Sequence, residues 1–247
     1  MTQTSVMNDW PQPITATIDG GALDVWHINL DNLDQAAWSE TLTAAEFARA
    51  ARLLRPGAGE RFLQARFALR SLLGRYLDRV PQSLEFALNQ FGKPALPGSQ
   101  LGFNLSHSGN RAVLAISRQQ AIGVDIEQLT AHRDVHGLAR QVCTPSESAD
   151  LAALPDQALA LAFSICWTRK EAYLKALGVG LSVDPRVVAV GLLPIPLHVS
   201  EVFSGSGSVA VQTIDISDGF AISVAVRSDH RRVSDSVNLR QFERMKY

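Results

Sequence analysis

The chain has 247 residues, of which 46% are hydrophobic and 19% charged, and its formal net charge at pH 7 is −1. This composition is typical of one large globular domain or of two small domains packed together. A protein that coats nucleic acid or an anionic membrane needs a large basic excess, so the charge balance argues against both kinds of partner. Residues 1–13 lack the basic and apolar segments of a secretory signal, which predicts a cytoplasmic location, and the longest apolar stretch, 158–167, is too short to span a membrane.

The first half of the chain contains patterns of both strands and helices. Thr43 has Glu46 three residues later, which is the spacing of a capping box at the start of a helix. A Ser-Gly-Asn segment at 108–110 is typical of a hairpin turn. Alternating or apolar runs predict strands, and apolar residues at helical spacing predict helices, over these ranges: strands at 22–30, 84–88, 101–105, 111–117 and 121–127, and helices at 43–54 and 60–77.

The second half repeats this order loosely, with a long helix predicted over 156–177 and strands over 209–216 and 220–226. In each half a Leu-Gly pair, at 73–74 and 177–178, is expected to end or interrupt the long helix. We therefore predict an α+β fold of two similar halves, 1–120 and 121–229, followed by a polar tail, 230–247. Two unrelated α+β halves are the alternative.

The two cysteines, Cys143 and Cys166, are too few and too far apart in the sequence to predict a disulfide scaffold or a thiolate metal site. Cys166 lies in the predicted long helix. Because free cysteines are usually buried, we expect it to be a core residue.

The strand pattern A-I-G-V-D-I-E at 121–127 places two acids on the same side of a strand. Side chains alternate between the two faces of a strand, so Gly123, Asp125 and Glu127 share a face. Two carboxylates at this spacing can converge on one hard cation, and the glycine leaves space beside them. A solvated strand face is the alternative for this pattern.

The predicted long helix adds a third acid. Trp167, Glu171 and Lys175 are four residues apart and form one stripe. Taken alone, Glu171 and Lys175 could be an ordinary surface ion pair. Three acids with a neighbouring lysine, however, suit a Mg²⁺ ion that is held together with the phosphate groups of a substrate.

Several other groups are candidates for binding an anion. Ser106, His107 and Ser108 lie at or near the end of a predicted strand, where their hydroxyls and imidazole are available to an anion. Lys93 stands between a glycine and a proline, and Arg66 shares a helix face with Arg70. A solvated turn histidine and solvated basic side chains are the alternatives. The Ser-His-Ser segment does not have the spacing of a nucleophilic triad.

Four segments, in order, resemble the motif series of a known family: G-K-P at 92–94, F-N-L-S-H-S at 103–108, G-V-D-I-E at 123–127 and W-T-R-K-E-A-Y-L-K at 167–175. They are similar to those of the larger, monomeric class of 4′-phosphopantetheinyl transferases, which activates peptide and polyketide synthases. The resemblance spans residues 43–181. It implies two α+β halves related by pseudo-twofold symmetry, with the active site in the cleft between them. It also implies Mg²⁺-dependent transfer of the 4′-phosphopantetheine group from coenzyme A to a serine of an apo acyl or peptidyl carrier protein, releasing adenosine 3′,5′-bisphosphate.

The resemblance further implies roles for individual residues. Three acids would bind Mg²⁺: Asp125, Glu127 and Glu171. Lys175 would neutralise phosphate charge, and either Glu171 or a metal-bound water would take the proton of the carrier serine. The groups that would bind coenzyme A at its nucleotide end are Lys93, Ser106, His107 and Arg66, and Lys93 is expected to lie beside His107 at the 3′-phosphate.

Some positions depart from the family's pattern. Arg49 and Arg52, which would also bind coenzyme A, stand where many relatives have lysines, so that phosphate contact is less secure. Cys143 stands where many relatives have phenylalanine, and Val179 stands where a lysine is frequent. The sequence has no phosphate loop and no kinase signature, which argues against an ATP-driven enzyme. The rival interpretation is a noncatalytic module that binds coenzyme A or carrier proteins.

Overall fold

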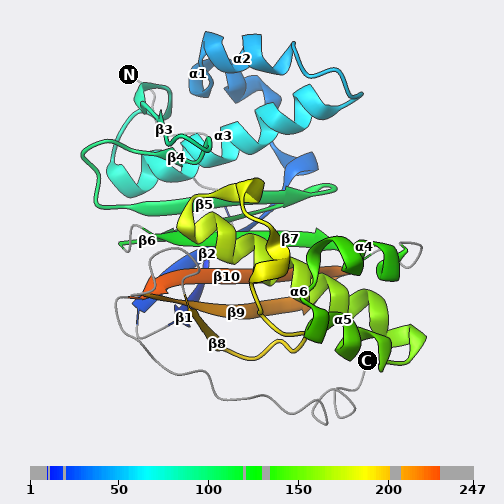
Figure 1. The fold of residues 1–247 in the computed structure, drawn as a ribbon. Helices are drawn as coiled ribbons and strands as arrows, with labels where there is room; N and C mark the ends of the chain where they lie inside the picture. Colours follow the sequence, from blue (N-terminus) through cyan, green and yellow to red (C-terminus); the bar gives the residue numbers. More distant parts are fainter. Residues whose placement is uncertain are drawn as a thin grey trace.

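A computed structural model describes residues 10, 12–18, 21–118, 121–129, 134–200 and 207–228. It confirms the predicted α+β class: two four-stranded antiparallel sheets are stacked, and each carries one long helix (Figure 1). The predicted polar tail at 230–247 lies outside the described residues. The division at residue 120 and the pseudo-twofold relation between the halves stay predictions.

The first sheet has the strand order β1 (Ile14–Ile18), β2 (Gly21–Asn29), β6 (Arg111–Ser117) and β5 (Gly102–Ser108). The helix α3 (Ala58–Leu77) buries Leu69 and Leu72 against Trp26, Phe103 and Leu114 of this sheet. This half also contains α1 (Trp38–Thr41), α2 (Ala44–Ala50), three short 3-10 helices and a small hairpin of β3 (Ala87–Leu88) and β4 (Pro94–Ala95).

The second sheet has the order β7 (Ile122–Gln128), β10 (Phe220–Ser228), β9 (Ser208–Ser217) and β8 (Leu197–Ser200). The helix α6 (Asp156–Leu177) packs on it, and α4 (Val135–Val142) and α5 (Pro145–Ala152) pack in turn against α6. The bounds of α6 are those that the apolar periodicity predicts. A left-handed Gly178, with φ of 71°, ends the helix as expected.

The two sheets share a hydrophobic core. Val25, Val113 and Ala115 of the first sheet lie in one buried cluster with Val124 and Val224 of the second. The edge strands β5 and β7 lie side by side (Figure 1), and the backbone N–H of Val124 donates to Asn104 Oδ1 at 2.8 Å. The edges of two different sheets are thus brought together.

Three local predictions can be compared with the structure. Thr43 and Glu46 form both hydrogen bonds of the predicted capping box at the start of α2. The helix α3 continues through Gly74 to Leu77, so the expectation that this glycine ends or interrupts it is wrong. Of the predicted strand at 84–88, only Ala87 and Leu88 pair with a partner, since the register of the small hairpin covers two residues on each side.

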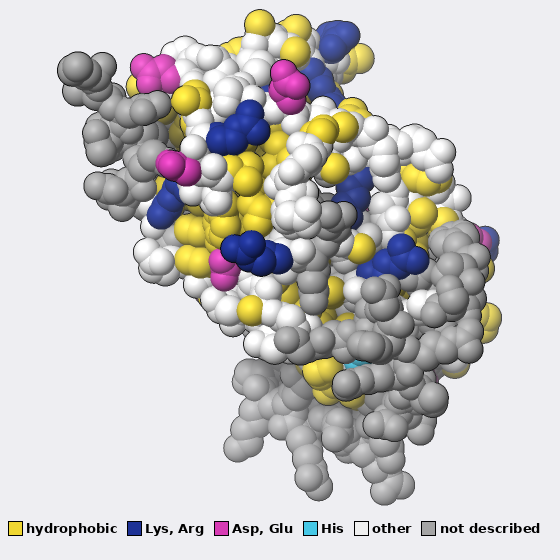
Figure 2. Space-filling model, turned by 90° about the vertical axis from the view of Figure 1, so that its left-hand side faces the viewer, with side chains coloured by type: hydrophobic (Ala, Val, Ile, Leu, Met, Phe, Trp, Pro, Cys, Tyr) yellow, Lys and Arg dark blue, Asp and Glu magenta, His cyan; other side chains and the backbone are white. Residues whose placement is uncertain are grey.

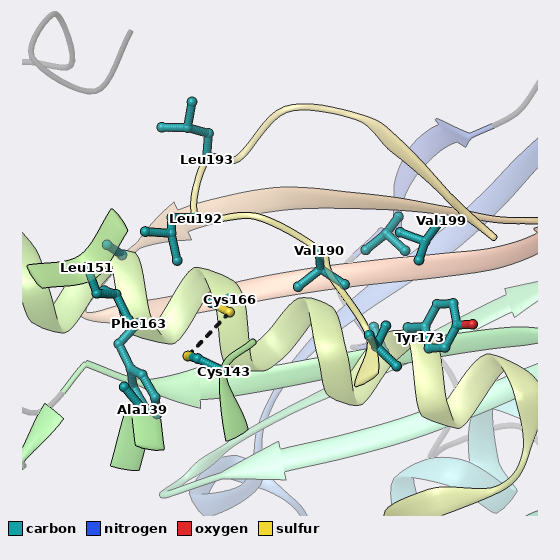
Figure 3. Packing of buried hydrophobic residues seen from close by; sticks show 14 of the residues in the cluster. Ala139, Cys143, Leu151, Phe163, Cys166, Tyr173, Val190, Leu192, Leu193 and Val199 are labelled. Carbon is teal, nitrogen blue, oxygen red and sulfur yellow. Dashed lines mark hydrogen bonds between the residues drawn. The ribbon is translucent and has the colours of Figure 1, made fainter. Parts of the chain in front are cut away.

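The two cysteines are far apart in the sequence but lie close together in the structure. Cys143, at the C-terminal end of α4, and Cys166 of α6 are both buried, with their sulfur atoms 3.9 Å apart (Figure 3). The burial of Cys166 is as predicted, but the proximity was not expected, because it depends on how α4 packs across α6.

Figure 2 shows the side of the molecule that carries the β3–β4 hairpin. Hydrophobic side chains gather there between Lys and Arg side chains, and acidic side chains are fewer. Throughout the described residues, no helix is long and apolar enough to cross a membrane.

Candidate active site

The candidate site lies where β5 meets β7. Ser106 Oγ donates to Asp125 Oδ1 at 2.7 Å, and Ser108 Oγ donates to Glu127 Oε2 at 3.1 Å. Because the paired positions increase together along both strands and side chains alternate between faces, Ser106 and Ser108 both face acids of β7. The two serines therefore orient the two carboxylates that the alternating pattern placed on one face.

The helix α6 closes this site from the other side. Lys175 Nζ donates to Asp125 Oδ1 at 2.5 Å and to Ser106 Oγ at 3.0 Å. The same ammonium lies 3.9 Å from Glu171, and Trp167 Nε1 donates to Glu127 Oε1 at 3.3 Å. The predicted stripe of Trp167, Glu171 and Lys175 is thus confirmed as the face of α6 that meets the acids of β7.

A glycine makes this close approach possible. A Cβ atom added at Gly123 would lie 2.0 Å from the carbonyl oxygen of Ala172 and 2.5 Å from the backbone nitrogen of Ala176. No side chain fits between β7 and α6 at this point. The absence of a side chain at Gly123 therefore lets the ammonium of Lys175 reach Asp125.

The charges of the site are only partly balanced. Asp125 is 3% exposed, and its Oδ2 atom is buried without a hydrogen-bond partner among the described groups. Burial raises the pKa of Glu171, as do the charges of Asp125 and Glu127, while Lys175 opposes the shift. A buried orphan carboxylate oxygen beside an acid with a raised pKa is the arrangement that a bound cation relieves.

The spacing of the acids limits how a cation can be held. Among the described residues, the one set of three metal-ligating side chains whose donor atoms all lie within 4.8 Å of one another is Cys143, Glu147 and Cys166. Asp125, Glu127 and Glu171 are more widely spread, so an ion between them would need water or substrate oxygens, or a side-chain rotation, to complete its coordination.

Cys143, Glu147 and Cys166 form a cluster that stabilises the packing of α4, α5 and α6 and is poorly suited to bind a metal. Lys170 Nζ lies 2.7 Å from Glu147 Oε2, and the backbone N–H groups of Thr144, Val190 and Gly191 donate to the same carboxylate at 2.8–3.1 Å. Its oxygens already have these donors. A buried, fully hydrogen-bonded carboxylate that is paired with a lysine has little capacity left to bind a metal.

His107 lies at the open end of the site. Its side chain is exposed, yet neighbouring side chains remove part of its hydration, and this loss lowers its pKa. The positive charges of Lys175 and Arg61 act in the same direction, whereas Asp125 opposes them. The imidazole therefore stands in a locally positive region, which favours an anionic ligand.

Lys93 does not lie where we expected it. Its Nζ donates to the carbonyl oxygens of Ile122 at 2.8 Å and Lys175 at 2.6 Å, at the start of β7 and near the C-terminal end of α6. Ile122 is at the far end of the β5–β7 pair from His107, roughly 15 Å away at the rise of a strand. The expected contact between Lys93 and His107 is therefore wrong.

Two of the three first-half arginines that the resemblance assigns to coenzyme A, Arg49 and Arg66, have partners within the chain. Arg66 Nε donates to Glu46 Oε1 at 2.6 Å, and its guanidinium lies over the ring of Phe86. Arg49 is exposed and lies over the ring of Phe62, while Arg52 is exposed. The proposed contacts of these three arginines with coenzyme A stay predictions.

The sequence did not single out Asn104 or Arg61, and it predicted an anion-binding hydroxyl at Ser108 where the structure shows a hydrogen bond to Glu127. Ser108, which holds Glu127, and Asn104, which joins the sheets, both face β7, and their alternation with Ser106 along β5 was a readable signal. The sequence interpretation also assigned Ser106 to the nucleotide end of coenzyme A, apart from the acids. The structure instead places its hydroxyl between Asp125 and Lys175. Arg61 has no comparable signal in the sequence.

The sequence of this chain is similar to those of several known proteins. Residues 121–225, which include β7 and α6, match the 4′-phosphopantetheinyl transferase superfamily. The 4′-phosphopantetheinyl transferase HetI of Nostoc sp. is 38% identical over 178 residues, which are 70% of this chain and 75% of that protein. A 4′-phosphopantetheinyl transferase of Bacillus subtilis is 29% identical over 75% of this chain and 85% of its own length. The 4′-phosphopantetheinyl transferase AcpT of Salmonella typhimurium is 39% identical over 58% of this chain and 73% of its own length.

Proposed function

Because this chain belongs to the 4′-phosphopantetheinyl transferase superfamily, we propose that it transfers the 4′-phosphopantetheine group of coenzyme A to a serine of an apo acyl or peptidyl carrier protein. The reaction depends on Mg²⁺ and releases adenosine 3′,5′-bisphosphate. The observation that carries the proposal is the cluster at β5, β7 and α6: a lysine on one oxygen of Asp125, a second oxygen of Asp125 without a partner, and Glu171 beside them.

The donor set fits a magnesium ion. Mg²⁺ is commonly held by one or two carboxylates, with water and substrate phosphates completing its coordination. Asp125 Oδ2 is the free buried acceptor, Glu171 is the second acid, and Glu127 completes the set that would hold the ion. When bound, Mg²⁺ supplies positive charge at the pyrophosphate of coenzyme A. The wide spacing of the acids leaves room for the phosphate oxygens among its ligands.

The side chains of the chain itself perform the remaining tasks. Lys175 is close enough to Asp125 to neutralise phosphate charge next to the metal ligands. Glu171 takes the proton from the attacking hydroxyl of the carrier serine, because its raised pKa makes it a stronger base than an ordinary glutamate. The attack forms a bond from the serine oxygen to the β-phosphorus of coenzyme A, and the bond to the bridging oxygen breaks. Catalysis is then mainly positioning and charge neutralisation.

His107 is the best-placed candidate for the 3′-phosphate of coenzyme A. It is exposed in part, and burial, followed by the charges of Lys175 and Arg61, lowers its pKa; the negative charge of a bound phosphate would oppose that shift. Lys93 and Arg66 would have to give up their present hydrogen bonds to join it. We therefore assign nucleotide recognition first to His107.

The deciding experiment is a mass measurement on a carrier protein. The chain is incubated with Mg²⁺, coenzyme A and an apo carrier, and transfer appears as a mass gain of one phosphopantetheine group on the carrier serine. A carrier with alanine at that serine is the substrate control. Asp125→Asn should nearly abolish the mass gain while leaving the fold intact, and Glu127→Ala should have a milder effect because water can replace one ligand of Mg²⁺.

The rival, a noncatalytic module that binds coenzyme A or carrier proteins, predicts a different outcome. Coenzyme A or the carrier would bind, but the carrier mass would not change with any of several acyl and peptidyl carriers. Near-normal transfer by Asp125→Asn at limiting Mg²⁺ would instead rule out the assigned metal site, but it would still support the transferase activity. The pathway of the carrier, the monomeric state and the cytoplasmic location stay predictions.

A further inference from the structure

Cys143 and Cys166 are the two cysteines of the chain, and the fold brings their side chains into contact. They are 23 positions apart in the sequence, yet their sulfur atoms lie 3.9 Å apart, and both are free thiols (Figure 3). Cys143 directly follows α4, and Cys166 lies within α6. A bond between the two sulfurs would therefore tie α4 to α6.

The local backbone allows the two sulfurs to come closer. A disulfide needs its sulfur atoms about 2.05 Å apart, so the pair has to approach by about 2 Å, which is about 1 Å for each sulfur. Cys143 is the C-cap residue of α4 and has an extended backbone, with φ of −85° and ψ of 149°. An extended residue can use side-chain rotamers that a helix forbids. A rotation of the Cys143 side chain toward Cys166 can therefore supply much of the approach.

The surroundings make the two thiols unequal. The hydrogen bond with Cys166 lowers the pKa of Cys143, and the charge of Lys170 acts in the same direction, whereas burial and the charge of Glu147 oppose the shift. Burial raises the pKa of Cys166. The thiolate is the reactive form of a cysteine. Cys143 is thus the thiol that reacts first, and Cys166 is placed to attack it afterwards.

We propose that Cys143 and Cys166 form a reversible disulfide in exchange with a small-molecule disulfide, for which oxidised glutathione is the probe. The Cys143 thiolate attacks one sulfur of oxidised glutathione, so a mixed disulfide forms and one glutathione thiolate leaves. The sulfur of Cys166 then attacks the sulfur of Cys143, and the second glutathione leaves. The two cysteines lose two electrons in total, oxidised glutathione gains them, and the two thiol protons end on the two glutathione molecules.

Burial of the thiols controls the rate of this exchange and not its equilibrium. The helix α4 has eight residues, and a helix of two turns has little stability of its own, so it depends on its packing against the rest of the fold. Transient opening of such a segment would expose Cys143 to the reagent. The position of the equilibrium depends instead on how close the sulfurs are when α4 is packed on α6.

The disulfide should also stabilise the fold. A bond between positions 143 and 166 closes a loop and removes conformational freedom from the unfolded chain. By linkage, the factor by which folding favours the disulfide equals the factor by which the disulfide favours folding. The chain-entropy model gives roughly a hundredfold for a loop of this length, and strain in the bond would reduce this factor. The proposal does not rest on the transfer reaction.

The test equilibrates the whole chain with mixtures of reduced and oxidised glutathione, under native conditions and in concentrated urea. After quenching and alkylation, mass spectrometry gives the fraction of chains with an internal disulfide. Chains that start reduced and chains that start oxidised should reach the same fraction. We expect the effective concentration of one thiol toward the other to be at least about tenfold higher in the native chain than in urea. The oxidised chain should have a Tm higher by roughly 4–10 °C.

Three variants make the result specific. Cys143→Ala and Cys166→Ala each leave one thiol, so they can form only a mixed disulfide with glutathione and should not gain the Tm increase. The matched control combines Cys143→Ala with Gln141→Cys and keeps two thiols at nearly the same separation in the sequence. Gln141 is exposed on α4, and two residues correspond to about 200° around a helix, so the new thiol points away from Cys166. This control should show no native advantage over urea.

Each of three outcomes would overturn the proposal. The first is a native chain that is oxidised no more readily than the chain in urea, a comparison that needs no variant and remains decisive if a substitution prevents folding. The second is a native control with Gln141→Cys that is oxidised as readily as the wild type. The third is a stable mixed disulfide on Cys143 without an internal bond. No carrier protein or coenzyme A enters these measurements, so the proposed function and this disulfide can fail independently.

Discussion

Replacing Lys93 with methionine distinguishes two roles for a residue that the family resemblance assigns to coenzyme A. In the structure its ammonium donates to the carbonyl oxygens of Ile122 and Lys175 at 2.8 and 2.6 Å. Lys93 thus cross-links the turn of the β3–β4 hairpin to the start of β7 and the end of α6. Methionine keeps most of the aliphatic stem and removes the charged donor, so the variant tests the cross-link with little change in packing.

The magnitude follows from two opposing effects. A hydrogen bond from a charged group contributes about 1.5–3 kcal/mol, so the two short bonds together contribute about 3–6 kcal/mol. Burial lowers the pKa of Lys93 from 10.5 to about 8, which corresponds to about 3 kcal/mol against the charged form. We therefore expect Lys93→Met to reduce the free energy of unfolding by roughly 1–3 kcal/mol, or Tm by roughly 3–10 °C.

The pH dependence has a definite sign. Between about pH 8 and 10 the folded state has released the proton of Lys93, whereas the unfolded chain still binds it. Stability contributed by this group therefore rises with pH across that window. The difference in the free energy of unfolding between the wild type and Lys93→Met should widen from pH 7 to pH 10, as measured by urea unfolding.

A matched control and a kinetic measurement complete the test. Arg118→Met removes an exposed cation and should change stability by no more than about 0.5 kcal/mol. Well below its Tm, Lys93→Met should keep a KM for coenzyme A within about threefold of the wild type, the scale of a small surface effect. Unchanged stability together with a KM raised tenfold or more would refute the structural role and restore Lys93 as a phosphate ligand.

Three further predictions concern single titratable side chains. In EDTA, Glu171→Gln should raise Tm at pH 7–8, because burial and the neighbouring acids disfavour the ionised glutamate in the folded state. The gain should vanish near pH 4, because a glutamate with a raised folded-state pKa costs stability only as it ionises, and Mg²⁺ should then stabilise the wild type more than the variant. His107→Ala should raise KM for coenzyme A by roughly ten- to a hundredfold, from a contact of about 1.5–3 kcal/mol, while dephospho-coenzyme A loses little; equal losses on both substrates would remove His107 from the 3′-phosphate. Lys170→Met leaves Glu147 buried without its cation and should cost about 3–5 kcal/mol in urea unfolding, whereas a loss below 1 kcal/mol would mean that water enters the cluster.

The long elements were predictable from the sequence because their patterns extend over several turns or residue pairs. The predicted bounds 156–177 and 111–117 agree with α6 and β6. The eight-residue helices α4 and α5 were missed, since two turns carry little periodicity. A readable signal was present even there: Thr144 and Glu147 form a capping box with Pro145 at the first helical position.

The candidate site was predictable where it depended on local periodicity and not where it depended on long-range packing. Alternation along β7 and the four-residue spacing in α6 correctly brought Asp125, Glu171 and Lys175 to facing surfaces. The partners of Lys93 could not be predicted, because backbone carbonyls at a helix end have no side-chain signature. The side-by-side placement of β5 and β7 likewise depends on how two sheets share a core.

The helix α6 uses its sides for different purposes, and this explains why charged residues occur along a largely buried helix. The side with Glu171 and Lys175 meets β7, and the close approach at Gly123 fixes its distance from Asp125. Lys170, one position earlier, is held by Glu147 on another side, which anchors the helix to α5. Because a helix rotates as a unit, the buried Lys170 pair limits the rotation that would draw Lys175 away from Asp125. The stability of the Glu147 cluster and the geometry of the candidate active site are therefore mechanically linked through a single helix.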